Sequence, residues 1–383
     1  MSFPDANDFL RQTGPLAPGA LAACDGLQAP PSGFERVWAT FEPMDAMQKR
    51  GQIFRPHSGE AWQLLCDEGT SLGGTDWAPP PLAYFAAGLA SSVSGSIAEC
   101  LAEQGIAAES VSVALDNNYS LRGSILRGTM EGKGHDADVE AAIADDQLTA
   151  KDKSSLVLQA VSGGLAGYLM KSVFPSEFAL IANGAPVSLD LPECHLEVDA
   201  QTLPIAALGT AGEAYVRKAF LRPADMPFEA GTGTGADAVQ DRPIKVSAAA
   251  QSRADGVTAM QAGIARPGAS VYDILGTPDA GAPGGPSSAC LIAAGIGFCF
   301  MTQLGRYAEA VKRPVHDYRM IQAIDIPLPG ADGSQTPVIG TKLFLNQDEP
   351  DAAFARDLAH SAKRTCFLHS TLQTSLRSRI SVR

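Results

Sequence analysis

The stretch Phe85-Ala-Ala-Gly-Leu89 returns 207 positions later as Ile292-Ala-Ala-Gly-Ile296, and this recurrence is the strongest indication of the fold in the sequence. Each copy lies within a run of small and apolar residues, 82–105 and 289–313, that is typical of a helix. Glycine and alanine on successive turns allow a second backbone to come close. We therefore expect both helices to be central and buried.

The segments around the two helices repeat as well. A strand-like run and a loop rich in glycine and proline precede each helix, and a pair of strands and a second helix follow it. In the first half these segments are 61–66, 67–81, 110–130 and 153–171, and in the second half 271–275, 276–288, 317–346 and 351–373. Aligning the first helices pairs Ser92 with Cys299, and aligning the second helices pairs Gly163 with Cys366. Because the two offsets differ by only four positions, we interpret the chain as an internal duplication.

The length of 383 residues suggests two cores, since a single ordinary domain is shorter. We expect an N-terminal extension over 1–34, a first repeat over 35–182, and a second repeat over 242–383. Residues 183–241 are rich in Pro, Gly, Ala and Thr and are expected to be a linker, with one short helix around Thr210–Arg217 as an option.

The formal net charge of −13 argues against a nucleic-acid or anionic-membrane partner, because either would require a basic face. With 45% hydrophobic and 19% charged residues, the composition is that of a soluble globular protein. No window approaches eighteen uninterrupted apolar residues, and the first residues carry acids where a signal peptide would be basic and then apolar. We expect a cytoplasmic protein.

Seven scattered cysteines fit reduced thiols better than a disulfide framework. There is no CxxC pair, no metal-ligand spacing, and no glycine pattern of a phosphate or dinucleotide loop, so neither a metal nor another cofactor is expected. Two cysteines stand out, because Cys299 lies in the small-residue helix of the second half and Cys366 in its last helix. Such thiols can approach each other in one core, although a lone cysteine in an apolar helix is more often a packing residue.

The order of hairpin, glycine-rich loop, helix carrying AAGxxxC, strand pair and helix carrying a second cysteine resembles the OsmC/Ohr family of small cysteine-based peroxidases. The resemblance covers residues 35–182 and 243–375. It implies an α+β fold of two OsmC-like repeats, each an antiparallel sheet with a central buried helix, that together form an intramolecular pseudo-dimer. Sites in that family lie at the interface between the two units.

The resemblance implies that Cys299 is the peroxidatic thiol and Cys366 the resolving thiol. The first half has Ser92 and Gly163 instead, so its own site is expected to be inactive. The family also uses a Glu one turn before the AAG, where this chain has Leu82 and Ala289.

An Arg from the first hairpin is the family's other site residue. Candidates here are Arg253 in the second half, and Arg50 or Arg55 in the first half, which a pseudo-dimer would turn toward Cys299.

We therefore expect a thiol-dependent reductase of organic hydroperoxides. A thiolate attacks the O–O bond, a second thiol condenses with the resulting sulfenic acid, and an external dithiol reduces the disulfide. The apolar residues around Cys299 favour a small hydrophobic hydroperoxide. Association with further copies of the chain stays open.

Three alternatives remain at this point. His369 follows Cys366 by one turn and could lower a thiol pKa or supply a base, but it could equally be incidental on a basic face that includes Lys363 and Arg364. The chain could be a non-catalytic scaffold that binds a small hydrophobic ligand. The same pocket could also serve a non-redox thiol enzyme.

Overall fold

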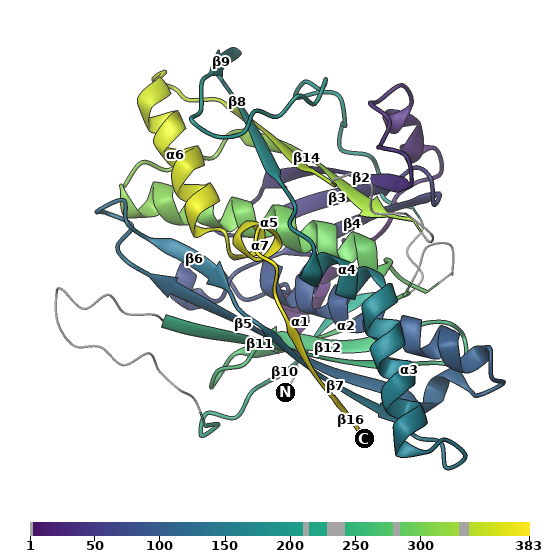
Figure 1. Cartoon of the computed structure of the whole chain (residues 1–383). Helices are drawn as coiled ribbons and strands as arrows, with labels where there is room; N and C mark the ends of the chain where they lie inside the picture. The colour runs from purple at the N-terminus through teal and green to yellow at the C-terminus, as the bar shows by residue number, and fades with distance from the viewer. Residues whose placement is uncertain (1–2, 210–213, 228–241, 279–283, 329–336) are drawn as a thin grey trace.

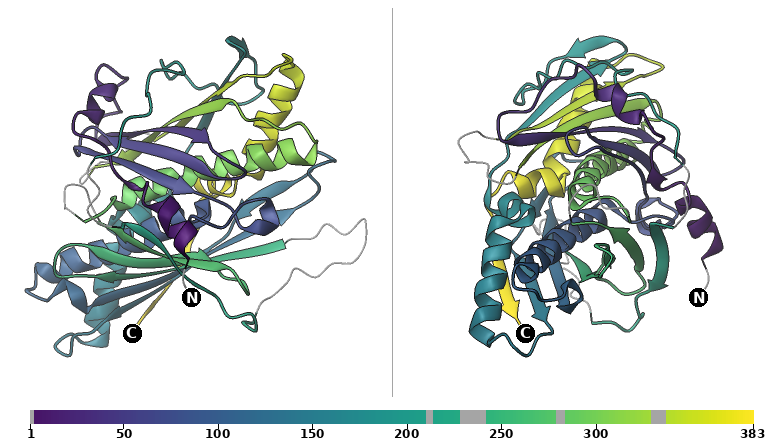
Figure 2. Two further views of the ribbon diagram at one scale, coloured as in Figure 1. Left: turned by 180° about the vertical axis from the view of Figure 1, so that it is seen from behind. Right: turned by 90° about the vertical axis from the view of Figure 1, so that its right-hand side faces the viewer.

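A computed structural model describes residues 3–209, 214–227, 242–278, 284–328 and 337–383. The fold is mixed α+β. Two large sheets enclose two long helices, α2 (Pro81–Ala102) and α5 (Ser288–Ala310), which lie side by side between them (Figures 1 and 2). Helix α5 packs on the strands of one sheet and α2 on those of the other. The layers are therefore sheet, helix, helix, sheet.

The described strands form two eight-stranded sheets. Sheet one has the order β1 (Gly14–Pro15), β4 (Glu60–Cys66), β3 (Lys49–Arg55), β2 (Phe34–Pro43), β14 (Tyr318–Pro327), β15 (Ile339–Leu345), β8 (Ser176–Ala182), β9 (Ala185–Val187). Sheet two has the order β10 (Val216–Leu221), β13 (Ser270–Gly276), β12 (Thr258–Ile264), β11 (Arg242–Ser252), β5 (Val111–Arg122), β7 (Ala137–Ile143), β16 (Ser378–Val382), with β6 (Glu131–Gly134) paired to β5.

Each sheet takes strands from both halves of the chain. In sheet one, β2 of the first half pairs antiparallel with β14 of the second, and in sheet two β11 of the second half pairs antiparallel with β5 of the first. The last strand of each half also crosses over, because β8 pairs parallel with β15 and β16 pairs parallel with β7. The two halves consequently share one continuous hydrophobic core instead of building two separate ones.

The central helices cross at the matched glycines. A Cβ atom on Gly88 would lie 2.8 Å from the carbonyl oxygen of Ser288, and one on Gly295 would lie 2.9 Å from the amide nitrogen of Phe85. Both contacts are with backbone, so the helices can approach this closely only where a side chain is missing. The expectation of two central, buried helices is confirmed.

Among the described residues, α2 and α5 are also the helices long and apolar enough to cross a membrane. However, 72% of the apolar window of α2 and 94% of that of α5 are buried inside the protein. Their hydrophobicity is therefore accounted for by the core, which is consistent with a soluble protein.

The second helix of each half is broken, where the sequence predicted continuous helices. In the first half α3 (Ala150–Gly163) ends and α4 (Leu165–Lys171) begins at Gly164, and in the second half α6 (Ala352–Thr365) ends and α7 (Phe367–Leu372) begins at Cys366. The structural counterpart of Cys366 is therefore Gly164, one residue beyond the Gly163 that the alignment suggested. At Cys366 the backbone leaves the helix, with an extended ψ of 112°.

The segments outside the repeats are ordered against the sheets. The N-terminal extension contains α1 (Pro4–Leu10), β1 and the short 3₁₀ helix η1 (Ala20–Cys24). Its residues Leu16 and Cys24, together with linker residues such as Leu196 and Leu203, cover the outer face of sheet one in a second apolar cluster, whereas α1 packs against β10 of sheet two. Two further 3₁₀ turns are η2 (Thr70–Leu72) and η3 (Ala108–Ser110).

The linker contains strands where the sequence allowed only a short helix. Val216 and Arg217 open β10, at the edge of sheet two. The start of that optional helix, 210–213, lies outside the described residues, as do the linker residues 228–241, part of the second glycine-rich loop, 279–283, and residues 329–336 of the last strand pair.

Candidate functional site

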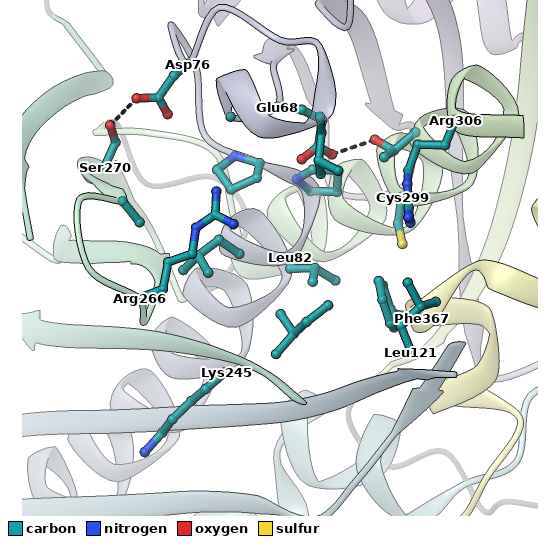
Figure 3. A pocket seen from close by; sticks show the side chains of 18 of the residues that line it. Glu68, Asp76, Leu82, Leu121, Lys245, Arg266, Ser270, Cys299, Arg306 and Phe367 are labelled. Atoms are coloured by element: carbon teal, nitrogen blue, oxygen red, sulfur yellow. Dashed lines mark hydrogen bonds between the residues drawn. The ribbon is translucent and has the colours of Figure 1, made fainter. Parts of the chain in front are cut away.

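Cys299 lies in the middle of α5 and borders a cavity of about 410 Å³ between the two halves. The side chain is only 1% exposed, so the sulfur is reached through this cavity (Figure 3). Leu82, Leu121 and Phe367 give the cavity an apolar wall near the sulfur. The first two belong to the first half of the chain and the third to the second, so both halves form the wall.

Cys366 lies behind Cys299, at the break between α6 and α7, and is fully buried. The thiol of Cys299 is a close enough neighbour to interact with it. Burial raises the pKa of Cys366 well above its ordinary value, and the neighbouring Cys299 raises it further, while the backbone N–H groups of His369 and Leu368 lower it in part. Cys366 is therefore held as a neutral thiol.

His369 is the second partner of Cys366, with its Nδ1 atom 3.2 Å from Cys366 Sγ. The imidazole packs against the rings of Phe178 and Phe300, with centroid distances of 5.4 and 5.5 Å. Burial lowers its pKa to about 3, with a smaller contribution from Lys363. A neutral ring does not lower the thiol pKa by charge. Instead, its Nδ1 forms a hydrogen bond with the thiol, and the tautomer of the ring decides which of the two atoms donates.

Two charged residues that were not predicted from the sequence, Glu68 and Arg306, line the cavity that Cys299 borders. Thr302 and Arg306 follow Cys299 at the i+3 and i+7 positions of α5, which puts all three on one face of the helix. Thr302 donates a 2.7 Å hydrogen bond to Glu68 Oε1, and Arg306 donates one of 3.0 Å to Gln303. The helical spacing was available in the sequence, whereas Glu68 comes from the other half.

The charges of this group are coupled. Burial lowers the pKa of Arg306, and the neighbouring Glu68 and Cys299 raise it. Burial also raises the pKa of Glu68, whereas Lys49, Thr302 and Arg306 favour its ionised form. The Arg306 guanidinium thus interacts electrostatically with both Glu68 and Cys299.

Asp67 fixes the loop that carries Glu68. This fully buried carboxylate accepts hydrogen bonds from the backbone N–H groups of Glu68, Thr75 and Trp77 and from the Thr75 hydroxyl, at 2.6–3.0 Å. Four donors on one side chain bend residues 67–77 back over the start of α2. Glu68 is therefore presented to α5 by a rigid loop.

The mouth of the cavity is positively charged, in contrast to the chain as a whole. Arg242, Lys245 and Arg266 line it. Lys245 pairs with Asp116 at 2.6 Å, and Arg266 donates to the Ser71 hydroxyl at 3.1 Å. The acidic lining residue Asp76 is itself paired with Lys218 at 2.7 Å.

The arginines predicted to serve Cys299 lie elsewhere. Arg55 is buried at the start of α5, where it contacts Glu35 at 2.6 Å, Glu60 at 3.0 Å and Ser287 at 2.8 Å. It neighbours Cys290, two and a half turns before Cys299. Two buried carboxylates hold it there, since an unpaired buried guanidinium would be costly.

The other two candidate arginines are bound to acidic neighbours. Arg253 is half-exposed and pairs with Asp255 at 2.7 Å in the turn between β11 and β12, and Arg50 pairs with Glu42. The structure therefore brings together Cys299, Cys366 and His369 from the predicted set, and none of its arginines.

The position equivalent to Cys299 in the first half is closed. Ser92 is buried, and its hydroxyl accepts a 3.1 Å hydrogen bond from the backbone N–H of Ala166. One turn further along α2, Pro278 packs so tightly on Gly95 that an added Cβ would lie 2.0 Å from the proline. A serine hydroxyl committed to a helix start, next to a filled groove, leaves no counterpart of the Cys299 cavity at this place.

Within the described parts of the chain, no group of three or more His, Cys, Asp and Glu side chains is arranged to hold a metal ion. Comparisons with models of protein families, with curated proteins and with solved structures each found no match to this chain.

Proposed function

We propose that the protein is a thiol-dependent reductase of organic hydroperoxides, with Cys299 as the attacking thiol and Cys366 as the resolving thiol. One observation carries this proposal. Cys299 borders the cavity, while the thiol of Cys366, which interacts with it, is fully buried. A substrate can reach the first sulfur but not the second, which gives the two cysteines separate roles.

The reaction needs no group beyond the substrate and an external dithiol. The Cys299 thiolate attacks the terminal oxygen of ROOH, the O–O bond breaks, and an S–O bond forms, which leaves Cys299 sulfenic acid. The released alkoxide takes up the proton that the Cys299 thiol had lost and leaves as ROH. Cys366 then attacks the Cys299 sulfur, so that an S–S bond forms and water leaves. A dithiol reduces this disulfide and is itself oxidised.

Leu82 and Ala289 stand where the OsmC/Ohr family has its Glu, so this chain lacks that charge. Arg306 and Glu68 supply charged groups near Cys299 instead. The Arg306 guanidinium stabilises negative charge on the Cys299 sulfur, and Glu68, fixed by Thr302, offsets the cost of keeping that guanidinium half-buried. The apolar wall suits the organic part of a hydroperoxide, and the cationic mouth suits a substrate that also carries an anionic group.

The architecture supports the finer part of the proposal, an OsmC-like tandem that acts as a pseudo-dimer. The exchange of strands between the halves in both sheets, and the crossing of α2 and α5 at matched glycines, are what two intertwined units would require. A cytoplasmic location, where dithiol reductants are available, belongs to the same proposal.

Mass spectrometry after addition of one equivalent of cumene hydroperoxide tests the function. We expect a Cys299–Cys366 disulfide in the wild type, and trapped sulfenic acid on Cys299 in Cys366→Ser. Cys299→Ser should give neither product and should lose peroxide turnover with a dithiol. Cys290→Ser is the matched control, because Cys290 is equally buried on the same helix but is not among the residues that line the Cys299 cavity. If the wild type forms neither product, the reductase proposal is refuted.

A further inference from the structure

The hydroxyl of Tyr119 is a buried polar group without a partner in the described part of the chain. The residue is 2% exposed, and its oxygen has no hydrogen-bonding partner. Leaving a buried hydroxyl unpaired costs about 1–3 kcal/mol, so such groups need an explanation. One explanation is a hydrogen-bond acceptor that is present only during the reaction.

Tyr119 lies on β5, which the first half contributes beneath the Cys299 cavity. Residues alternate between the two faces of a strand, so Tyr119 shares its face with Leu121, which lines the cavity. The Tyr119 ring packs against that of Phe367, with a centroid distance of 5.6 Å. In Figure 3 both Leu121 and Phe367 lie next to the sulfur of Cys299. Tyr119 is therefore one contact behind the reacting thiol.

The phenol stays protonated next to the two thiols. Burial raises the pKa of Tyr119 well above its ordinary value, and the neighbouring Cys299 and Cys366 raise it further. Because Cys299 and Cys366 both affect its pKa, the hydroxyl lies close enough to both thiols to interact with them electrostatically. It is thus a hydrogen-bond donor throughout the neutral pH range.

The second half has no such donor. The offset of 207 positions that aligns the central helices pairs Tyr119 with Ile326 on β14. An isoleucine fills the space and has no hydroxyl. The donor is therefore present in the half that complements Cys299 and missing in the half that would complement Ser92.

We propose that Tyr119 donates a hydrogen bond to the oxygen that Cys299 carries after peroxide attack, and stabilises this oxygen as it leaves. The role rests on the proposed function. When Cys366 attacks Cys299 sulfenic acid, the S–S bond forms, the S–O bond breaks, and the Cys366 proton ends on the departing water. Tyr119 keeps its own proton. The first half thus supplies a catalytic residue to the site of the second.

Rapid-quench kinetics of Tyr119→Phe test this role. The protein is mixed with one equivalent of cumene hydroperoxide, and sulfenic acid, sulfinic acid and disulfide are quantified by mass spectrometry over time. Loss of one hydrogen bond to a leaving oxygen should slow disulfide closure about tenfold or more, with peroxide consumption little changed. The longer-lived sulfenic acid should also yield more sulfinic acid when peroxide is in excess.

Tyr318→Phe is the matched control, since Tyr318 is also buried on a strand but is not a neighbour of either thiol. Equal closure rates in wild type and Tyr119→Phe would overturn the role, and so would equal slowing in both variants, because that would indicate general loosening. If the wild type forms neither sulfenic acid nor disulfide, the proposed function itself fails, which is a different result from closure at an unchanged rate.

Discussion

His369 makes the stability of the protein depend on pH in a way that can be calculated. The imidazole is completely buried, and its pKa falls from an ordinary value of 6.5 to about 3. The folded state therefore binds no proton at this site between pH 7 and 5, whereas the unfolded chain does. Because protons bind only the unfolded state in this range, stability falls as the pH is lowered through 6.5.

The magnitude follows from the two pKa values. Between pH 7 and pH 5 this one group should lower the free energy of unfolding by about 2 kcal/mol, and between pH 7 and pH 6 by about 0.7 kcal/mol. Replacing the imidazole by a neutral amide in His369→Gln removes the titration, while the amide oxygen can still accept from the Cys366 thiol. The wild type should thus lose about 2 kcal/mol more than the variant.

Urea denaturation of both proteins at pH 5, 6 and 7 measures this difference. All other titrating groups are common to both, so their contributions cancel in the comparison. His57→Gln is the control, because His57 is exposed, and its profile should follow the wild type. Parallel stability profiles for wild type and His369→Gln would show that His369 is not buried as a neutral ring, and would refute the interpretation of the Cys366–His369 contact.

Three further predictions concern the helix crossing and the cavity. Gly295→Ala should lower the free energy of unfolding by about 1–3 kcal/mol, because its Cβ would press on the backbone of α2. Gly163→Ala is the control in the same urea assay. A Cβ at position 163 would have nothing within 4 Å, so this variant should be neutral or stabilising by up to about 1 kcal/mol. Arg306→Gln should lower the second-order rate of reaction with cumene hydroperoxide about tenfold, and Arg306→Lys should keep most of it, because the charge stabilises the thiolate; equal rates for the two variants would contradict this. Arg266→Gln should raise KM for a carboxylate-bearing hydroperoxide about two- to fivefold and leave KM for cumene hydroperoxide unchanged, and parallel changes would exclude an anion-binding role for the cavity mouth.

The central layer of the fold could be predicted from the sequence because its cause is local. Helices that cross closely need small residues at the crossing, and Gly88 and Gly295 are these residues in the first and second halves. The break at Cys366 could not be predicted, since the residues around it include neither glycine nor proline. It arises from tertiary packing, because the chain turns there to bury Phe367 and His369.

The thiols and the histidine of the site were predicted, whereas Arg306, on the same helix as Cys299, and Glu68, from the other half, were missed. Cys299, Cys366 and His369 were found by spacing and resemblance. Glu68 was not, because only the folded arrangement brings its loop to α5. Arg55 was assigned to the wrong end of that helix, because the two buried carboxylates that bind it are 20 and 5 positions away in sequence and reveal their proximity only in the sheet.

Both halves of the chain build the cavity, although the first half has Ser92 and Gly163 where the second has Cys299 and Cys366. Gly295 admits α2 against α5, and the loop before α2 brings Glu68 to Thr302. Strand β5 places Leu121 in the cavity wall opposite the thiol. Removing the first half would expose α5 and open the cavity to water, because α2, the Glu68 loop and β5 cover it. The first half therefore supports the Cys299 site through its contacts, although it carries no cysteine at the aligned positions, and Pro278 fills the space beside Gly95 on α2.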